Sequence, residues 1–320
     1  MQIASCPGCC GKNYRPLGRL AENFSGRAGD QVFHQPDYRA LLCPDCGLVF
    51  KSDTLDWPEL ERYYRCVDFT KWEITGLFPT ERSVVRVLER LPDRSRVLDF
   101  GCSTGRLLAR VCNRLDCFGL EMNPEAASVA SAKGIQIIAE SSLTDPNALK
   151  FDAIVLCDVF EHLPDPTTVL CNLSAHLHAS GTLIVVTGNA DAPAFAADIA
   201  NSWYLRTVEH LCMMSRRYAE FLAMRINAKL TQWELCSHYD TPLTETLKQH
   251  AQRFAYWTFH GNTSALRRGF VALLPILRRA RYWQFQPALN CTKDHVVAVF
   301  TKQASKETAS DQSDGHGAMT

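Results

Sequence analysis

Short runs of β-branched and other apolar residues alternate with helix-like stretches from about residue 83 onward. Near-continuous apolar strands separated by helices are typical of a parallel sheet covered on both faces. We therefore expect an α/β fold with a doubly wound, mostly parallel sheet. The strand candidates are 96–101, 117–121, 135–140, 151–158, 181–188, 230–239 and 294–302.

One helix between these strands can be recognised from its end signals. Asn123, Pro124 and Glu125 supply an N-cap, a proline in the first turn and an acid at the positive end of the helix. Gly134 can end the same helix in a left-handed conformation. The sequence therefore predicts a helix between these two signals.

The chain divides into a small N-terminal module, a linker and a larger domain. The first 50 residues are rich in Cys, Gly and Pro and are too short to bury a core alone, so a metal ion or another domain must stabilise them. About 50 residues separate the last two strand candidates, far more than a hairpin requires. We predict a module at 1–52, linker or lid helices at 53–82, a main domain at 83–302 with a helical insert at 240–292, and a disordered tail at 303–320.

The composition is that of an ordinary globular protein, with 46% hydrophobic and 21% charged residues. Lys plus Arg equals Asp plus Glu at 34 each, so no overall field attracts nucleic acid or an anionic membrane. No apolar run reaches the ~18 residues that cross a bilayer, and the N-terminus lacks the apolar stretch of a signal peptide. We therefore expect a cytoplasmic protein in which cysteines such as Cys102, Cys157 and Cys171 stay reduced and buried.

The most informative segment is VLDFGCSTGRLL at 97–108. In it an apolar strand ends in Asp99, Gly101 and Gly105 form a tight turn, and a helix is expected to begin near Arg106. Glycines in such a turn let backbone N–H groups approach a ligand closely, and a helix N-terminus favours electron-rich atoms. The segment therefore predicts a small-molecule site at the strand ends.

The acids around this turn indicate which cofactor it binds. Glu121 ends the next strand 22 residues after Asp99, the interval at which an acid bonds the two ribose hydroxyls of an adenosine. A nicotinamide-binding fold would show G-x-G-x-x-G, so that pyrophosphate can sit on the helix dipole. A carboxylate two residues before Gly101 repels pyrophosphate but suits the cationic amino-acid end of S-adenosylmethionine.

The segment 97–108, the pair Glu121-Met122 and the run FDAIVLCDVFEHLPDP at 151–166 resemble the class I S-adenosylmethionine-dependent methyltransferases. The likeness is greatest to the branch that carries an E-H-L-x-D-P element after the fourth strand. It covers about 80–240. It implies a Rossmann-like sheet of seven strands whose last strand is antiparallel.

The resemblance also implies roles for single residues. Glu121 would take the ribose, Met122 would pack on adenine, and the turn would line the methionine part. Backbone near Cys157 and Asp158 would close the pocket. Ser103 stands where many members have a glycine, which implies slightly less room beside the cofactor. The predicted cofactor-binding residues are Asp99, Gly101, Cys102, Gly105, Glu121, Met122, Cys157 and Asp158.

Two C-x-x-C pairs lie in the N-terminal module, Cys6 with Cys9 and Cys43 with Cys46, and 33 residues separate them. Four thiolates suit a structural, tetrahedral Zn²⁺ that leaves no open position for catalysis. Cys10 could replace Cys9, and reduced free thiols or an iron–sulfur cluster are the alternatives. The segment around the second pair resembles the zinc ribbon that precedes the catalytic domain in some methyltransferases acting on sugars and other secondary metabolites.

Methyl transfer is an in-line displacement, so the protein chiefly supplies alignment, a dry pocket and, for a hydroxyl or carbon acid, a base. We predict His210 as this base, with Glu209 orienting or balancing the charge of its ring. A histidine that merely satisfies a loop carbonyl is the alternative. Sugar C-methyltransferases similar to this chain have a Tyr where it has Thr207, which weakens that narrower assignment. His162 is interpreted as structural, capping the turn after strand four.

The segment RRGFVALLPILRRARYW at 267–283 contains five arginines and no acid around an apolar core. It could hold a helix on an anionic membrane surface. It could instead be an ordinary helix covering the sheet, with arginine stems along apolar surface. Pro275 interrupts the helical period, so we favour the second interpretation.

The leading hypothesis is therefore S-adenosylmethionine-dependent methylation of a small molecule, such as a sugar, a saccharide intermediate or a secondary metabolite, by an enzyme with a zinc-bound N-terminal module. RNA methylation is a second hypothesis, and the zero net charge argues against it. A non-enzymatic interaction protein with a vestigial cofactor domain is a third, and the intact Asp99, Gly101, Gly105 and Glu121 argue against that. The sequence leaves the methylated atom and the oligomeric state open.

Overall fold

The computed structural model describes residues 1–68, 73–196, 198–261, 263–275, 277–287, 289–290 and 292–303. Apart from Gln303, the tail expected at 303–320 lies outside the described residues. The same holds for the part of the predicted linker at 69–72.

The larger domain is built on a seven-stranded sheet of order β12-β13-β10-β9-β6-β7-β8. Strand β13 runs antiparallel to both of its neighbours, β10 and β12, and the β10-β9, β9-β6, β6-β7 and β7-β8 pairs are parallel. The mostly parallel Rossmann-like sheet with an antiparallel last strand is therefore confirmed. Its strands are β6 (Arg96–Phe100), β7 (Asp116–Leu120), β8 (Gln136–Ile137), β9 (Phe151–Cys157), β10 (Leu177–Gly188), β12 (Ala228–Cys236) and β13 (His295–Lys302).

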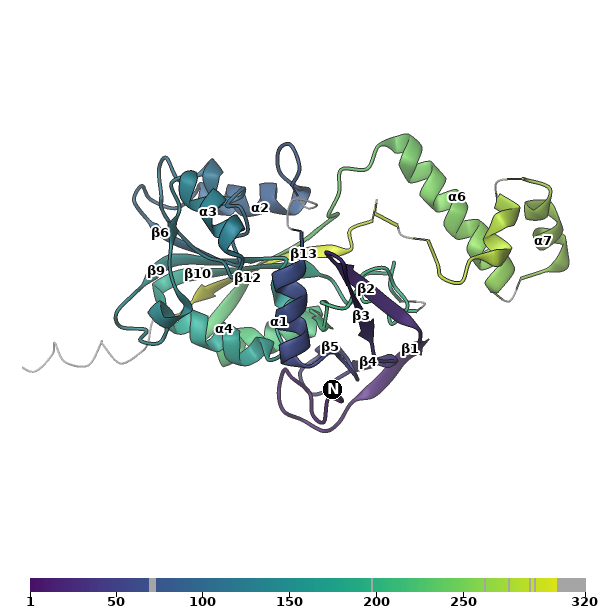
Figure 1. Ribbon diagram of the computed structural model, residues 1–320, viewed down its shortest axis with the longest axis horizontal. Coiled ribbons are helices and arrows are strands. Elements are labelled where there is room, and N and C mark those ends of the chain that lie inside the picture. The colour runs from purple at the N-terminus through teal and green to yellow at the C-terminus, as the bar shows by residue number, and fades with distance from the viewer. Residues whose placement is uncertain are drawn as a thin grey trace, which may run out of the picture.

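Both faces of the sheet are buried, because successive residues of each central strand feed two different cores. In β9, Ile154 and Leu156 face one core, whereas Ala153 and Val155 face the other. Helices α4 (Pro166–Ala175) and α5 (Arg216–Arg225) pack into the first core, and α2 (Pro79–Leu88) and α3 (Pro124–Ala132) into the second. Figure 1 shows the two layers of helices.

Helix α3 begins and ends at the residues that its end signals predicted. The side chain of Asn123 accepts hydrogen bonds from the backbone N–H groups of Glu125 and Ala126, at 3.0 and 3.1 Å. Gly134, two residues after the helix, has φ +87°. These contacts satisfy backbone groups that the ends of a helix leave without partners.

The prediction of a helix that begins near Arg106 is wrong. The segment forms turns around a short 3₁₀ helix, η2 (Leu108–Arg110), in which i–3 and i–4 hydrogen bonds alternate. The apolar residues of this segment are buried at helical spacing in either geometry, so hydrophobic periodicity cannot distinguish the two. The other 3₁₀ segments of the domain are η3 (Glu140–Leu143) and η4 (Phe160–His162).

The N-terminal module is joined to the larger domain through a shared sheet and a shared core. Strand β5 pairs with β11, a two-residue strand of the larger domain, in a sheet of order β1-β4-β5-β11. Leu48 and Phe50 belong to the same core as Tyr218 of α5. The elements concerned are β1 (Arg15–Ala21), β4 (Tyr38–Leu42), β5 (Val49–Lys51) and β11 (Cys212–Met213), with the separate hairpin β2 (Phe24–Ala28) and β3 (Gln31–Gln35) and the helix α1 (Trp57–Cys66).

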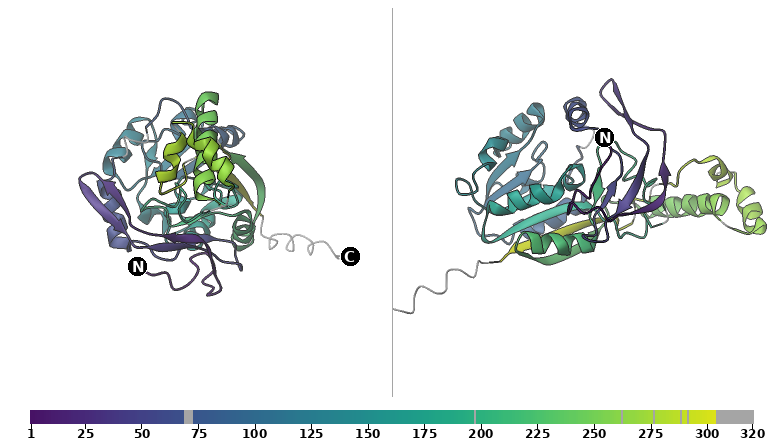
Figure 2. Two further views of the ribbon diagram at one scale, coloured as in Figure 1. Left: turned by 90° about the vertical axis from the view of Figure 1, so that its right-hand side faces the viewer. Right: turned by 90° about the horizontal axis from the view of Figure 1, so that it is seen from below.

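The insert before β13 projects away from the sheet as an arm, as Figures 1 and 2 show. It consists of α6 (Leu243–His260), α7 (Ala265–Ala272) and η5 (Leu277–Tyr282), which share a small core around Val271 and Ala280. The favoured interpretation of 267–283 as a helix covering the sheet is therefore wrong. Pro275 separates α7 from η5, and the two short elements fold back on α6 instead.

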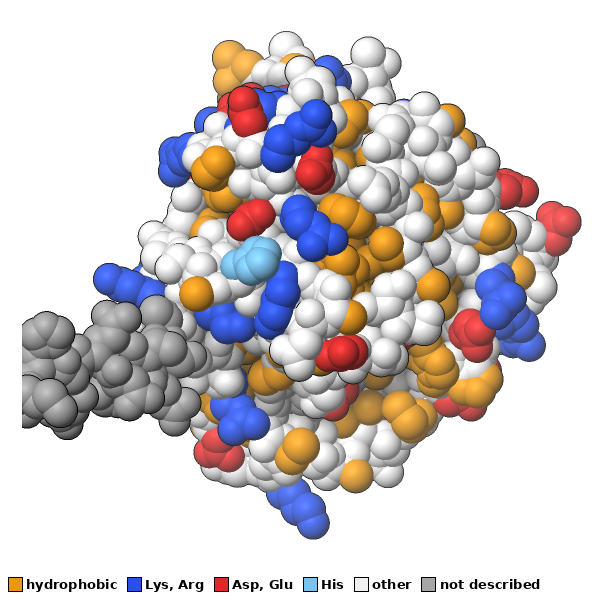
Figure 3. Space-filling view, turned by 90° about the vertical axis from the view of Figure 1, so that its left-hand side faces the viewer, with side chains coloured by type: hydrophobic (Ala, Val, Ile, Leu, Met, Phe, Trp, Pro, Cys, Tyr) orange, Lys and Arg blue, Asp and Glu red, His pale blue; other side chains and the backbone are white. Residues whose placement is uncertain are grey.

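Among the described residues, no helix combines the length and apolar character that crossing a membrane requires. On the face drawn in Figure 3, acidic and basic side chains are interspersed among apolar ones. This face therefore carries no single-sign field.

Candidate functional site

The glycine turn after β6 has the geometry that brings backbone close to a ligand. Gly101, Ser103 and Gly105 all have left-handed backbones, with φ of +82°, +48° and +73°. A Cβ at Gly101 would lie 2.6 Å from Cγ2 of Val159, and one at Gly105 would lie 2.2 Å from Cδ1 of Ile135. The turn therefore requires glycine at both positions, for its dihedral angles and for its close packing.

Asp99 lies in β6 directly before this turn and is 2% exposed. Its Oδ1 atom is buried and has no hydrogen-bond partner among the described residues. Burial, followed by the nearby charges of Glu81 and Glu121, raises the pKa of Asp99 to about 8. A buried carboxylate without a partner is costly, and a cationic ligand would remove that cost.

Glu121 follows β7 and is held in place by backbone donors. Its Oε2 accepts a hydrogen bond from the N–H of Ser103 at 2.9 Å, and its Oε1 accepts one from the N–H of Asn123 at 2.8 Å. The carboxylate therefore ties the glycine turn to the N-terminus of α3. Beside it, the Met122 side chain is 58% exposed and free to lie against a ligand.

The Cys102 side chain points into the fold. An ideal Cβ at Gly119 would lie 2.6 Å from the Cys102 Sγ, so this thiol packs on the neighbouring strand β7. Burial raises the pKa of Cys102. The predicted role of Cys102 can therefore belong only to its backbone.

Asp158, directly after β9, has φ +54°, which is uncommon for a residue other than glycine. Its N–H donates to the Val186 carbonyl oxygen at 3.1 Å, and its Oδ1 is buried without a hydrogen-bond partner among the described residues. The next residue, Val159, is the one that Gly101 contacts. The structure thus brings the predicted residues at the ends of β6, β7 and β9 together at the carboxyl edge of the sheet, where open α/β folds bind ligands.

The structure places His210, half-buried, on the loop that follows β10. Its Nδ1 lies 2.7 Å from the Tyr204 carbonyl oxygen, which can only accept, so Nδ1 carries the proton and Nε2 the lone pair. Burial, with the nearby His162 next, holds the pKa of His210 well below its usual value. The ring is therefore neutral. The Tyr204 carbonyl orients it, and among the described residues Glu209 forms no hydrogen bond with it.

A buried network next to His210 was missed by the sequence analysis. The Glu161 carboxylate is 1% exposed and accepts hydrogen bonds from the Tyr204 hydroxyl at 2.6 Å and the Thr187 hydroxyl at 2.8 Å. The Tyr204 hydroxyl in turn accepts from the N–H of Gly188 at 2.7 Å. The E-H-L-P-D-P element marks Glu161, but nothing in the sequence pattern marks Tyr204 as its partner.

His162 contacts both the linker and the His210 loop. Its Nδ1 lies 3.2 Å from the Tyr64 hydroxyl of α1 and 3.2 Å from the Glu209 carbonyl oxygen. Its ring meets the His210 ring edge-on, with centroids 4.9 Å apart. These contacts agree with the structural role expected for His162.

A second group that the sequence analysis missed joins three strand ends. Asp158, His238 and His295 bring a carboxylate oxygen and two imidazole nitrogens within 4.8 Å of one another. The residues are about 80 and 57 positions apart in the chain, so no local motif could have revealed them.

The four predicted zinc ligands meet in the N-terminal module. The Sγ atoms of Cys6, Cys9, Cys43 and Cys46 all lie within 4.8 Å of one another, and the Cys6–Cys46 and Cys9–Cys43 pairs are each 3.5 Å apart. Cys10 is exposed and lies outside this group. Tetrahedral Zn–S bonds of about 2.3 Å place sulfurs slightly under 4 Å apart, so this arrangement fits a zinc ion.

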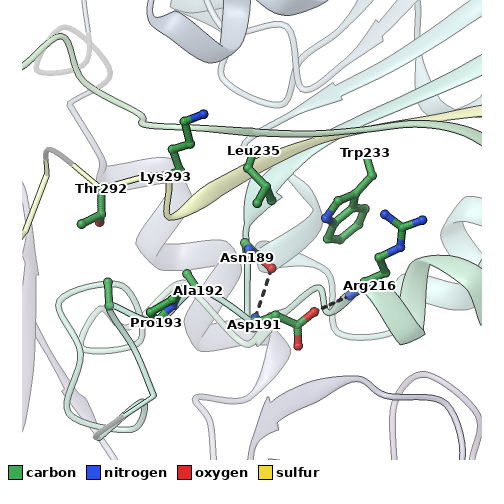
Figure 4. A pocket seen from close by; sticks show the side chains of 10 residues that line it. Asn189, Asp191, Ala192, Pro193, Arg216, Trp233, Leu235, Thr292 and Lys293 are labelled. Carbon is green, nitrogen blue, oxygen red and sulfur yellow. Dashed lines mark hydrogen bonds between the residues drawn. The ribbon is translucent and has the colours of Figure 1, made fainter.

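A cavity of about 480 Å³ lies beside the last strands, between the ends of β10 and β12 and the start of α5 (Figure 4). The Asp191 carboxylate accepts from the Arg216 N–H at 2.7 Å on its floor, and Trp233 forms one wall. None of the predicted site residues lines this cavity, which is distinct from the glycine turn.

Comparison with known proteins identifies the domain. The family described as "Methyltransferase domain" matches residues 77–233. The ubiquinone biosynthesis O-methyltransferase of Xanthomonas axonopodis pv. citri is 29% identical over 152 residues, which are 44% of this chain and 61% of that protein. The same enzyme of Xylella fastidiosa is 27% identical over 157 residues, or 46% and 62%. The chain thus spans about three-fifths of the length of these relatives.

Solved structures with a similar fold include the YcgJ protein of Bacillus subtilis, with TM-score 0.48 and 17% identity over 70% of this chain and 99% of that one. The N-methyltransferase NodS of Bradyrhizobium japonicum, in complex with S-adenosyl-L-homocysteine, has TM-score 0.43 and 17% identity over 77% and 97%. The family match and the strand order together show that residues 77–233 belong to a class I S-adenosylmethionine-dependent methyltransferase domain, as the motifs indicated.

The unpartnered carboxylate of Asp99 predicts a pH-dependent gain in stability on its removal. The folded pKa of about 8 lies above the unfolded value of about 3.9, so ionised Asp99 destabilises the folded state increasingly as the pH rises from about 4 to 8. In the unliganded protein, Asp99→Asn should therefore raise the free energy of unfolding at pH 7.5 by about 2–4 kcal/mol.

Urea unfolding at several pH values measures this difference. The gain should shrink toward zero near pH 4, where both folded and unfolded Asp99 are protonated. Asp30→Asn, on an exposed turn, is the matched control and should change stability little at any pH. A gain that is the same at pH 4 and pH 7.5 would contradict the assignment to buried charge.

Proposed function

We infer that this protein transfers the methyl group of S-adenosylmethionine to a small-molecule acceptor, with oxygen as the receiving atom. The observation that carries this inference is the unpartnered Asp99 oxygen beside a glycine turn that Glu121 fastens from the other side. When bound, the cofactor supplies an electrophilic methyl group on a sulfonium. Every other requirement falls to the chain itself: binding, alignment, exclusion of water and acceptance of a proton.

The residues at the carboxyl edge fit the two ends of this cofactor. Asp99 would balance the charge of the methionine end, and the backbone at Gly101, Cys102 and Gly105 would lie along it. Glu121 would accept from the ribose hydroxyls, since a carboxylate already held by two N–H donors retains acceptor capacity. Met122 would cover the adenine, with the backbone at Cys157 and Asp158 closing the pocket. These roles agree with the exposure and orientation described above.

His210 would serve as the base for a hydroxyl acceptor. The Tyr204 carbonyl fixes Nδ1–H, so Nε2 is the atom that would take the proton. The low pKa of His210 keeps the ring neutral and able to accept. Glu209 would contribute to the charge balance of this loop, together with the buried Lys51, whose pKa burial lowers to about 7.

The acceptor class follows from what the relatives are called and from the charge of the chain. The relatives are named O-methyltransferases of ubiquinone biosynthesis, and a zero net charge offers no field for a nucleic acid. We therefore propose a small hydroxylated acceptor, with a sugar, a saccharide intermediate or a secondary metabolite as the candidate classes. Buried thiols such as Cys117 and Cys212 suit a reducing cytoplasm.

The cysteine group of the N-terminal module would hold one structural Zn²⁺. Three of its four ligands are fully buried, and all coordination positions are filled by protein, so the ion would stabilise the fold. The Ser215 hydroxyl donates to the Gly47 carbonyl at 2.6 Å, and the Thr167 hydroxyl donates to the Gly8 carbonyl at 2.6 Å. Both loops that carry the cysteines are thereby attached to the methyltransferase domain.

The cofactor assignment predicts that Glu121→Ala lowers the affinity for S-adenosylhomocysteine by at least about tenfold, since a charge-assisted hydrogen bond contributes about 1.5–3 kcal/mol. Calorimetric titration measures the affinity, and circular dichroism checks that the fold is retained. Glu125→Ala removes an exposed acid from the first turn of α3, four residues away, and should bind normally. Unchanged binding by the Glu121 variant would count against the site.

The assignment of His210 predicts that His210→Ala slows turnover by about 10²–10⁴-fold while cofactor affinity stays within about twofold. The acceptor for this assay comes from a screen of hydroxylated metabolites with methyl-labelled donor. His178→Ala, an exposed histidine in β10, is the control. If turnover on that acceptor is unaltered in the His210 variant, another group takes the proton.

The metal assignment predicts about one Zn²⁺ per chain in freshly purified protein, retained through gel filtration. Cys43→Ser should lose the metal and lower the thermal midpoint by several degrees, because a buried ligand is missing and the shared core loosens. Cys10→Ser should keep both, since Cys10 lies outside the group. Elemental analysis and thermal unfolding give the two readouts, and zinc-free wild-type protein would refute the assignment.

A further inference from the structure

Asp158, His238 and His295 meet where three strands of the sheet end. Asp158 follows β9, His295 begins β13, and His238 lies two residues after β12, whose last residue, Cys236, pairs with His295. Because β10 and β13 lie between the outer two strands, only the folded sheet brings these side chains together. One oxygen and two imidazole nitrogens then lie within 4.8 Å of one another.

Two polar atoms of this group are buried and lack hydrogen-bond partners among the described residues: Oδ1 of Asp158 and Nδ1 of His238. The His238 Nδ1 lies 3.8 Å from Oδ2 of Asp158, too far for a hydrogen bond but close enough for both atoms to bind one ion. Leaving two buried polar atoms unpaired costs free energy that a bound ligand would recover.

Asp294 orients the third side chain. Its Oδ1 lies 2.9 Å from Nδ1 of His295, and the two side chains are 1% and 2% exposed. The carboxylate accepts a hydrogen bond from the Nδ1–H of His295, so in the neutral ring Nε2 carries the lone pair. A carboxylate that holds the far nitrogen of a histidine is the usual support of a metal-binding imidazole.

The ring of His238 is also fixed by packing. It stacks on Phe78 with centroids 4.5 Å apart and lies 4.7 Å from the His295 ring. Phe78 in turn lies under the Arg106 guanidinium at 4.9 Å, directly beyond the glycine turn. The three side chains are therefore held on strand ends and by aromatic contacts, as a binding site requires.

A comparison group in the same domain shows what a satisfied cluster looks like. Glu161, His162 and His210 also place three ligand-type atoms within 4.8 Å. There both Glu161 oxygens accept hydroxyl hydrogen bonds, and the Nδ1 atoms of both histidines have partners. The Asp158 group differs because Oδ1 of Asp158 and Nδ1 of His238 have no hydrogen-bond partner among the described residues.

We propose that Asp158, His238 and His295 form a binding site for one divalent transition-metal ion. Two imidazoles and one carboxylate suit borderline ions such as Zn²⁺, Fe²⁺ or Co²⁺, whereas Mg²⁺ and Ca²⁺ prefer oxygen ligands. Three protein ligands leave coordination positions open, unlike the four-cysteine group. Both His238 and His295 lie outside 77–233, the part of the chain that the methyltransferase family covers.

The Asp158 group lies close to the glycine turn that is proposed to bind the cofactor. Asp158 adjoins Val159, which packs on Gly101 of the cofactor turn. An acceptor hydroxyl that binds the ion would lose its proton more readily and would be anchored beside the cofactor. This role rests on the proposed function, whereas the metal site itself does not. The class of acceptor it favours has one hydroxyl, or two neighbouring ones, as metal ligands.

The test uses the full chain with zinc in its cysteine group. After dialysis against a weak chelator, Co²⁺ is titrated by calorimetry and visible absorption. We expect one Co²⁺ per chain with the weak bands of nitrogen and oxygen ligands, and without the intense thiolate bands that replacement of the cysteine-bound zinc would produce. His238→Ala and Asp158→Asn should each weaken binding at least about tenfold.

Asn has nearly the shape of Asp and tolerates the left-handed backbone at position 158. Weaker Co²⁺ binding by Asp158→Asn would therefore not be caused by misfolding. His34→Ala, which removes an exposed imidazole from β3, should bind Co²⁺ as the wild type does. The proposal would be overturned if the only Co²⁺ signal were thiolate-type absorption, or if all variants bound Co²⁺ with equal affinity. Separate titration with S-adenosylhomocysteine shows whether the cofactor pocket is intact, so failure of the metal site and failure of the proposed function are told apart.

Discussion

The burial of carboxylates at the carboxyl edge of the sheet is the constraint on which this site depends. Asp99 and Glu161 are 2% and 1% exposed, and Oδ1 of Asp158 is buried although its side chain as a whole is 30% exposed, so water cannot solvate these oxygens freely. Glu161 is compensated by two hydroxyl donors, but Asp99 and Asp158 each keep a buried oxygen with no hydrogen-bond partner in the described part of the chain. The fold accepts an energetic cost at these two positions, and cations are the ligands that relieve it.

The N-terminal module contributes to the same site through a less direct route. Strand β5 pairs with β11, and Lys51 at its end donates to the Thr207 carbonyl at 2.5 Å. The loop that carries His210 therefore runs between the module and the sheet and is hydrogen-bonded on both sides, since the N–H of Leu211 also donates to the Glu161 carbonyl at 2.7 Å. The module and the sheet thus both contribute hydrogen bonds to the loop that carries His210.

The sheet and the cofactor turn were predictable because they depend on local patterns. Strands buried on both faces appear as apolar runs, and a turn that needs left-handed backbone shows its glycines. The segment after Gly105 was not predictable, because α-helix and alternating 3₁₀ turns bury the same residues. The position of the arm was not predictable either, because an apolar stripe flanked by arginines can pack on a sheet or on another helix.

The missed site residues share a different cause. Tyr204, His238 and His295 contact partners that the fold brings to them from distant parts of the chain, and a single sequence carries no record of that pairing. His210 could be proposed as a base from its neighbours in the sequence. The carbonyl that selects its tautomer belongs to Tyr204, six residues earlier on an irregular loop, and no sequence pattern reveals that contact. A sequence shows which residues could take part in the chemistry, whereas the contacts that orient them depend on the topology of the fold.

The pairing of β5 with β11 has a consequence for how such a protein can evolve. The N-terminal module shares a sheet and a core with the larger domain, so it cannot be exchanged as an independent unit. Grafting it onto another catalytic domain would leave an unpaired strand edge on both parents. A change of side-chain volume on one side of this shared core must therefore be accommodated by residues on the other side.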